Sequence, residues 1–199
     1  PDTALFREIK NIGLYKVTGM DGAESKQTAA DYTTIVTVGA TSGPEPNVYL
    51  LDVKREKWTT KEGAGFLLST FEELKQHKTI VESRVKDNKH KTGGDALIVE
   101  IREQERIYKK YVNLYPVRPV ADKVTRALHI QPLIQDGRFF VNYKDPSHVG
   151  LVNEMTMFDG SGTYHDDRVD GLGLAITEII NRAGTVMDGN VTSAIGDNW

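Results

Sequence analysis

The sequence predicts an α/β fold in which a mixed β-sheet is flanked by helices. Three segments near the N-terminus predict strands separated by loops, and the second of them is rich in β-branched residues. From Phe66 onwards the apolar residues recur instead at helical spacing, and short apolar runs alternate with such helical segments. This order is typical of one sheet covered by helices. A length of 199 residues, with 39% hydrophobic and 27% charged residues, suits a single globular domain.

The first three strands form a predicted antiparallel meander. Residues 14–20 (LYKVTGM) form the first strand, which ends directly before Asp21. Residues 32–40 (YTTIVTVGA) are rich in β-branched side chains and form the second strand. A turn of Gly and Pro at 41–47 leads into the third strand at 48–53.

The remaining elements follow from periodicity and turn residues. Phe66, Leu67, Phe71 and Leu74 have helical spacing, and the apolar run 96–101 (ALIVEI) predicts a buried central strand. Further elements are expected in the second half: helices at 107–114, 122–134, 148–158 and 166–182, and short strands at 117–120 and 137–141. We therefore expect one domain at 1–183 and a loose, Gly-rich tail at 184–199.

The net charge of −3 conceals an asymmetry along the chain. Residues 75–91 carry six Lys and Arg against two acids (6 − 2 = +4), and residues 102–126 carry seven against three (7 − 3 = +4). Residues 150–199 carry two Arg against eight acids (2 − 8 = −6). A basic middle and an acidic end fit a protein that contacts phosphates and gathers carboxylates around metal ions. The alternative is an ordinary solvated helix surface of mixed charge.

The sequence also argues against several classes of protein. No run approaches the roughly 18 apolar residues needed to cross a bilayer, so we expect no membrane partner. The first residues lack the pattern of a signal peptide. The absence of Cys excludes disulfides and thiolate metal sites, and it fits a reducing compartment. No G-x-x-x-x-G-K-[ST] motif is present, so we expect no ATP hydrolysis by a P-loop mechanism.

Acidic residues stand at the ends of predicted elements. Asp21 follows the first strand, Glu100 lies near the end of the predicted strand 96–101, and the run HDDRVD opens the last helix. If these acids meet at one edge of the sheet, they offer the oxygen ligands that Mg²⁺ prefers, and two such ions would support phosphodiester cleavage. Alternatively, Asp21 belongs to a turn and Asp166 is a helix cap worth about 1 kcal/mol. A buried Glu100 needs a cation, a metal ion or solvent beside it.

These acids lie in segments that resemble one protein family. The segments are GMDGA, DYTTIVTVGA, NVYLLDVKREKW, ALIVE, VADKVTRALHIQPLIQDGRFFV and HDDRVDGLGLA, which together span roughly residues 12–182. Their order and spacing resemble the nuclease domain of phage large terminase subunits. The resemblance implies a ribonuclease H-like fold, with three antiparallel strands followed by parallel strands in a mixed sheet flanked by helices. Two departures stand out: residues 101–104 lack the small residue and glycine usual after the second acid, and Gly171 replaces the usual Ala.

The resemblance also implies a metal site. Asp21, Glu100 and Asp167 match the three acids that would bind two Mg²⁺ or Mn²⁺ ions and be catalytic. Asp170 stands where related Holliday-junction resolvases have another carboxylate, and Asp166 is a further possible ligand.

Other residues are expected to act around these metal ions. His165 is a candidate for proton transfer. Lys123 and Arg126 match an Asp-Lys-x-x-Arg motif that would contact DNA phosphates or support the site, and an exposed pair on a helix is the alternative. Lys109 and Lys110, in the second basic stretch, are further expected phosphate contacts.

The function implied is a metal-dependent DNA endonuclease that cuts concatemeric viral DNA during genome packaging in the host cytoplasm. Its expected partners are double-stranded DNA, an ATPase motor domain of the same full-length chain, the portal and the small terminase subunit. A first residue of Pro rather than Met fits a domain excised from such a chain. The alternatives are another ribonuclease H-like enzyme of the resolvase or transposase type, or a non-catalytic module that docks DNA or a partner.

Overall fold

A six-stranded mixed sheet forms the centre of the molecule. The computed structural model describes residues 8–9, 13–22, 32–83, 93–118, 123–160 and 165–193. Within them the strand order is β5-β4-β1-β2-β3-β6. The strands are β1 (Tyr15–Asp21), β2 (Thr33–Ala40), β3 (Val48–Glu56), β4 (Lys78–Glu82), β5 (Leu114–Val117) and β6 (Phe139–Phe140). β1, β2 and β3 are antiparallel neighbours, whereas β4 joins β1, β5 joins β4 and β6 joins β3 in parallel. The predicted meander followed by parallel strands is therefore confirmed.

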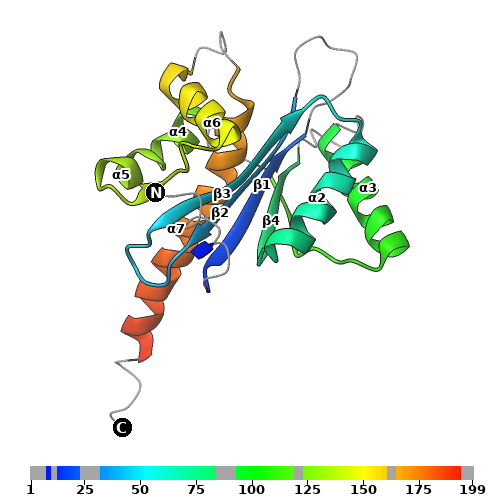
Figure 1. Ribbon diagram of the computed structural model, residues 1–199. Helices are drawn as coiled ribbons and strands as arrows, with labels where there is room; N and C mark the ends of the chain where they lie inside the picture. The colour runs from blue at the N-terminus through cyan, green and yellow to red at the C-terminus, as the bar shows by residue number, and fades with distance from the viewer. Residues whose placement is uncertain are drawn as a thin grey trace.

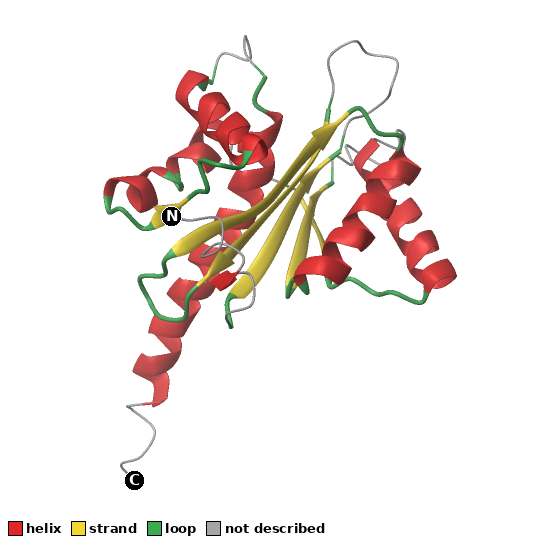
Figure 2. Cartoon of the chain, viewed as in Figure 1, coloured by secondary structure: helices red, strands yellow, loops and turns green. Residues whose placement is uncertain are grey.

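Helices cover both faces of this sheet (Figure 1). One face carries α2 (Thr60–Leu74) and α3 (Gly93–Tyr108), and Figure 2 shows the sheet enclosed between the two helical layers. The other face carries α4 (Lys123–Leu128), α5 (Gln131–Gln135), α6 (Pro146–Met157) and α7 (Asp167–Ser193). Each layer has its own hydrophobic core, one around Met20, Ile35 and Val81, the other around Val36 and Leu172.

Local sequence explains the main elements. β2 is buried along its whole length, which suits its run of β-branched side chains. α2 begins at a capping box, in which the Thr59 hydroxyl accepts from the amide of Glu62 and the Glu62 carboxylate accepts from the amide of Thr59. Asp145 caps α6 in a similar way by accepting a hydrogen bond from the amide of Ser147.

The prediction of a central strand at 96–101 was wrong. These residues lie inside α3, where Leu97 and Ile101 are buried one turn apart while Val99 between them is exposed. The parallel neighbour of β1 is instead β4, whose residues Thr79, Ile80 and Val81 are all β-branched. Residues 96–101 are therefore helical, and the strand that is parallel to β1 lies earlier in the chain, at β4.

Several boundaries also differ from the expectations. The helix expected at 107–114 is only the end of α3, and the strand expected at 117–120 is β5, which ends at Val117. The helix expected at 122–134 is divided into α4 and α5. Residues 84–92, between β4 and α3, fall outside the described residues.

The last helix is longer than expected and lies against the sheet. α7 continues to Ser193, so the expected loose tail from Gly184 is helical over its first ten residues. Its N-terminal part packs on β1 and β2. A Cβ atom at Gly19 would overlap the carbonyl oxygen of Gly171, so the two backbones are in direct contact. In the part of the chain that the structure describes, no helix is both long enough and apolar enough to span a membrane.

Candidate active site

Four side-chain positions form a row across one end of the sheet. Asp21 on β1 pairs with Thr34 on β2, and Thr34 pairs with Arg55 on β3. β1 and β4 are paired in parallel up to the residue before each acid, so Glu82 follows as the neighbour of Asp21. Two carboxylates thus stand side by side at the carboxyl ends of adjacent parallel strands, where α/β sheets commonly bind ligands.

This row faces α7. Side chains alternate between the faces of a strand, so Asp21 shares its face with Gly19, which touches α7. Glu82 likewise shares its face with Ile80, which belongs to the core cluster containing Leu172 of α7. The first turn of α7, which carries Asp167 and Asp170, therefore lies over the row.

Asp167, in that first turn, is bound to the β2–β3 side of the row. Its Oδ2 atom accepts hydrogen bonds from Arg55 Nε at 3.1 Å and Arg55 Nη2 at 2.9 Å. Its backbone carbonyl accepts from the Thr34 hydroxyl at 2.9 Å. These contacts anchor the start of α7 on the sheet, and they turn the Asp167 carboxylate toward β3 rather than toward Glu82.

Asp170, one turn further, points to the other side of the row. Its Oδ1 atom accepts from Arg126 Nη2 of α4 at 2.7 Å, and the same nitrogen lies 3.7 Å from Glu82 Oε2. The side chains of Arg126, Glu82 and Asp170 are 9%, 11% and 3% exposed, and Asp21 is 5% exposed. The structure thus places Asp21, Glu82 and Asp170 at one end of the sheet, and the buried guanidinium group of Arg126 lies beside Glu82 and Asp170.

Glu100, the predicted second acid, lies elsewhere. It is on α3, and its carboxylate accepts a hydrogen bond from Gln104 Nε2 at 3.0 Å on the next turn. Glu82 occupies the place at the end of the parallel strand that the sequence analysis gave to Glu100. The sequence signal for this strand is the β-branched run Thr79–Val81 directly before Glu82. This pattern is typical of a strand that ends in an acid.

The other predicted residues have mixed positions. His165 is exposed, lies edge-on to the Tyr32 ring at 5.6 Å, and has its Nδ1 atom 4.0 Å from Asp167 Oδ2. Asp166 precedes α7, and its carbonyl accepts from the amide of Asp170 at 2.9 Å. Both residues border the site.

Of the predicted phosphate-binding residues whose side chains the structure describes, Arg126 lies at this site, whereas Lys109 and Lys110 do not. Arg126 is directed at acids of the site. Lys109 and Lys110 follow the C-terminal end of α3, where Lys110 Nζ pairs with Glu72 of α2 at 2.6 Å. α3 starts beside Gly22 and is about 24 Å long at 1.5 Å per residue, so these lysines lie far from the acids. The Lys123 side chain lies outside the described residues.

The donor chemistry fits a hard divalent cation, although the ligands are not already gathered around one point. Carboxylates from β1, β4 and α7 are the oxygen donors that Mg²⁺ and Mn²⁺ take. Among the described residues, no three His, Asp or Glu side chains are close enough together to hold a metal ion as they stand. The contact of Arg126 with Asp170 and Glu82 accounts for part of this separation, because the guanidinium lies between them.

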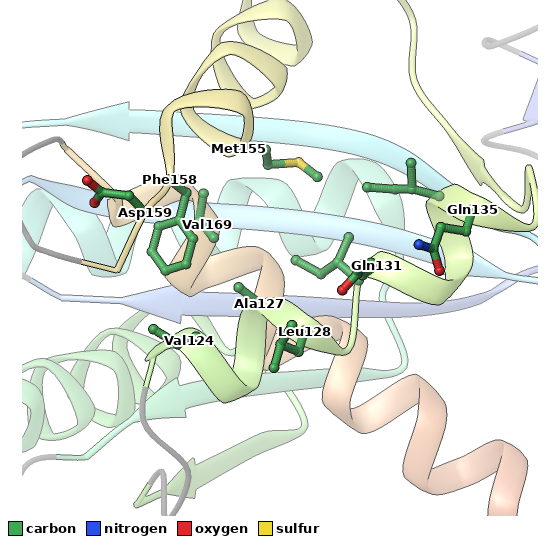
Figure 3. A pocket seen from close by; sticks show the side chains of 11 residues that line it. Val124, Ala127, Leu128, Gln131, Gln135, Met155, Phe158, Asp159 and Val169 are labelled. Carbon is green, nitrogen blue, oxygen red and sulfur yellow. The ribbon is translucent and has the colours of Figure 1, made fainter.

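An apolar cavity of about 410 Å³ lies beside the site (Figure 3). It is lined by α4, α5, α6 and the start of α7, with Val124, Leu128, Phe158 and Val169 among its walls. Asp159 is the one carboxylate of its lining. The described lining of the cavity therefore carries fewer acids than the end of the sheet, which is the candidate active site.

Comparison with solved structures identifies the fold. The large terminase nuclease of the thermophilic phage G20c, solved with bound magnesium, superposes with a TM-score of 0.58 at 17% identity, over 84% of this chain and 82% of that one. The same nuclease with bound cobalt gives a TM-score of 0.56 at 17% identity, over 82% and 81%. Thermus thermophilus RuvC gives 0.50 at 16% identity, over 85% and 97%.

The chain has a ribonuclease H-like fold. The strand order and the helices on both faces agree with this, and the fold implied by the terminase resemblance is confirmed. No protein-family model matches the chain, and no curated protein matches it.

Proposed function

We propose that this ribonuclease H-like domain is a metal-dependent nuclease. The observation that carries the proposal is the placement of Asp21, Glu82 and Asp170, two buried acids and one largely buried acid from β1, β4 and α7, at one end of the sheet. Burial of carboxylates is costly unless cations compensate them, and a divalent cation bound at this end of the sheet would compensate all three. The likeness of the fold to a nuclease solved with magnesium and with cobalt supports the same reading.

Asp21, Glu82 and Asp170 would hold the metal ions, in place of the set Asp21, Glu100 and Asp167. When bound, Mg²⁺ or Mn²⁺ would lower the pKa of a water and offset the charge that develops on the phosphate during hydrolysis. Asp21 and Glu82 are held by two paired strands, so their spacing is fixed by the sheet. Asp167 would act on the site indirectly by fixing the start of α7 through Arg55 and Thr34.

His165 remains the candidate for moving protons at the edge of the site. It is 60% exposed and can exchange protons with solvent, and Asp167 lies within 4.0 Å of its Nδ1 atom. Arg55 and Lys57 flank the Tyr32 ring beside it, at 3.7 Å and 5.2 Å from the ring centre. The exposed Lys57 gives this border a positive charge that would attract a nucleic-acid backbone.

The specific role we propose is that of a terminase nuclease domain. In that role it would cut concatemeric double-stranded DNA with two metal ions during viral genome packaging in the host cytoplasm. Its partners would be the ATPase motor domain of the same full-length chain, the portal and the small terminase subunit. The support is the terminase-like order of motifs together with the fold likeness to the G20c nuclease.

The test is cleavage of supercoiled plasmid by the purified chain with Mg²⁺, with Mn²⁺ and with EDTA, beside an Asp21→Asn variant. We expect cleavage that requires metal and is lost in the variant. Cleavage that survives Asp21→Asn after a second purification would contradict the proposed site. Absence of cleavage in both metals, with DNA binding retained, would support the docking module instead.

A resolvase is the second candidate, and the fold likeness to RuvC favours it. Equal amounts of a four-way junction and of linear duplex distinguish the two enzymes. A terminase-type nuclease should cut both at similar rates, whereas a resolvase should cut the junction preferentially.

A further inference from the structure

Arg126 is the buried cation of the proposed metal site. Its Nη2 atom lies 2.7 Å from Asp170 Oδ1 and 3.7 Å from Glu82 Oε2, and its side chain is 9% exposed. It reaches the site from α4, whereas the two acids belong to α7 and β4. The guanidinium thus joins two of the acids to which the proposed function assigns the metal ions.

A phosphate-binding role does not account for this position. A residue that binds the DNA backbone needs its donors at the surface, whereas Arg126 is turned inward to carboxylates. The neighbouring ion pair of Arg168 with Glu154, at 2.8 Å, gives a comparison on the same face of the sheet. Glu154 belongs to α6 and lies outside the row of acids, so that pair connects helices without touching the proposed ligands.

We infer that Arg126 is an internal counterion that competes with the divalent cation for Glu82 and Asp170. This inference rests on the proposed function. A guanidinium and a metal ion both use carboxylate lone pairs, so the oxygen of Asp170 that holds Arg126 has less capacity for metal. A positive charge a few ångströms from a divalent cation also repels it. Metal entry would therefore require Arg126 to give up its contact with at least one acid.

The change in metal affinity on removal of Arg126 distinguishes competition from a purely supporting role. If Arg126 preorganises the carboxylates, its removal weakens metal binding, as loss of residues that support ligands does. If Arg126 competes, its removal strengthens metal binding while the metal-free protein loses stability, because two buried acids lose their counterion. The two roles therefore predict opposite changes in metal affinity.

The experiment is isothermal titration of Mn²⁺ into metal-stripped protein, without DNA, for wild type, Arg126→Gln, Arg168→Gln and Glu82→Gln. We expect Arg126→Gln to bind Mn²⁺ about tenfold more tightly than wild type, from the Coulomb term for one removed charge. Arg168→Gln, the matched control, should bind within about twofold of wild type, since its carboxylate partner is not a proposed ligand. Unchanged or weaker binding in Arg126→Gln would overturn the inference.

Wild-type protein gives a second readout that does not depend on the folding of a variant. In the metal-free protein the Arg126 guanidinium should be held in place and should give separate Nη–H signals in ¹⁵N NMR. These signals are assigned to Arg126 because they are absent from the spectrum of Arg126→Lys. We expect saturating Mg²⁺ to release that restraint and average the signals. Signals that stay restrained at saturation would overturn competition.

The outcomes also separate this inference from the proposed function. If neither wild type nor Arg126→Gln binds Mn²⁺, the metal site itself is wrong. If wild type binds Mn²⁺ and Glu82→Gln does not, but Arg126→Gln leaves the affinity unchanged, the metal site stands and only the competition fails.

Discussion

Gly19 of β1 and Gly171 of α7 meet backbone to backbone. A Cβ atom at Gly19 would overlap the carbonyl oxygen of Gly171 and would lie 3.1 Å from the amide nitrogen of Ala175. This contact lets the first turn of α7 approach the sheet closely enough for Asp170 to lie near Glu82. The spacing between helix and sheet is therefore a condition for the proposed site.

Gly19→Ala should destabilise the protein strongly, because backbone atoms cannot rotate away as a flexible side chain can. We expect a loss of about 3 kcal/mol or more in the free energy of unfolding, at the upper end of overpacking costs. Urea denaturation followed by circular dichroism measures it, with Gly13→Ala as the control since a Cβ there meets nothing within 4 Å. Equal stability of the two variants would show that α7 does not contact β1 in this way.

Gly184→Ala should stabilise the protein. Gly184 lies within α7, and a Cβ there meets nothing within 4 Å, so the substitution gains helix propensity without a clash. We expect a gain of about 0.5–1 kcal/mol, measured by the same denaturation. No change would favour the loose tail that the sequence predicted from this residue onward.

Asp170→Asn and Asp167→Asn should differ in effect. Asp170 is a proposed metal ligand that binds Arg126, so its loss should reduce metal-dependent cleavage by about 100-fold or more, exceeding the typical effect of residues that only support ligands. Asp167 already binds Arg55 through two hydrogen bonds, and we expect a reduction of about tenfold or less. The measurement is the initial rate of plasmid cleavage in Mn²⁺ for each variant, after its folding has been checked. The reverse order would return the third metal ligand to Asp167.

Asp145 provides a pH-dependent contribution to stability. Burial of its carboxyl opposes ionisation, but the hydrogen bonds from the hydroxyl and amide of Ser147, together with the charge and backbone amide of His148, outweigh it, so the pKa of Asp145 lies below its ordinary value. A lowered folded-state pKa stabilises the fold at pH values above the ordinary pKa near ~4, and this stabilisation disappears as pH falls through the lower folded-state pKa.

Asp145→Ala should therefore cost about 1 kcal/mol at pH 7 through loss of the α6 cap, and less at acid pH. Urea denaturation of wild type and variant between pH 7 and pH 3 measures the difference. A difference that is constant over this range would mean that the ionised carboxylate does not form the cap.

The sequence predicted the first three strands of the sheet correctly, but it placed Glu100 on a strand that is helical in the structure. The first strands were correct because β-branched residues and Gly-Pro turns act locally, as in β2. The run ALIVEI was misread because a short apolar segment looks alike in a buried strand and in a helix that is half-buried. Its helical register becomes evident only when buried Glu105 is included with Leu97 and Ile101, at four-residue spacing.

The third acid illustrates a different limit. Three acids stand at the start of one helix, namely Asp166, Asp167 and Asp170. Their spacing alone does not tell which of them contacts a residue that is distant in the sequence. Arg55, 112 residues away, binds Asp167, and Arg126, 44 residues away, binds Asp170. Such pairings depend on tertiary contacts, which the local pattern does not contain.

Glu82 is the second acid of the proposed site, and its matched control is Glu100. Both are changed to Gln, and metal-dependent plasmid cleavage and Mn²⁺ affinity are measured for the two variants and wild type. We predict that Glu82→Gln loses about 100-fold or more of the cleavage rate and binds Mn²⁺ weakly, whereas Glu100→Gln stays within about twofold of wild type. Loss of cleavage in Glu100→Gln with full activity in Glu82→Gln would contradict the site described by the structure.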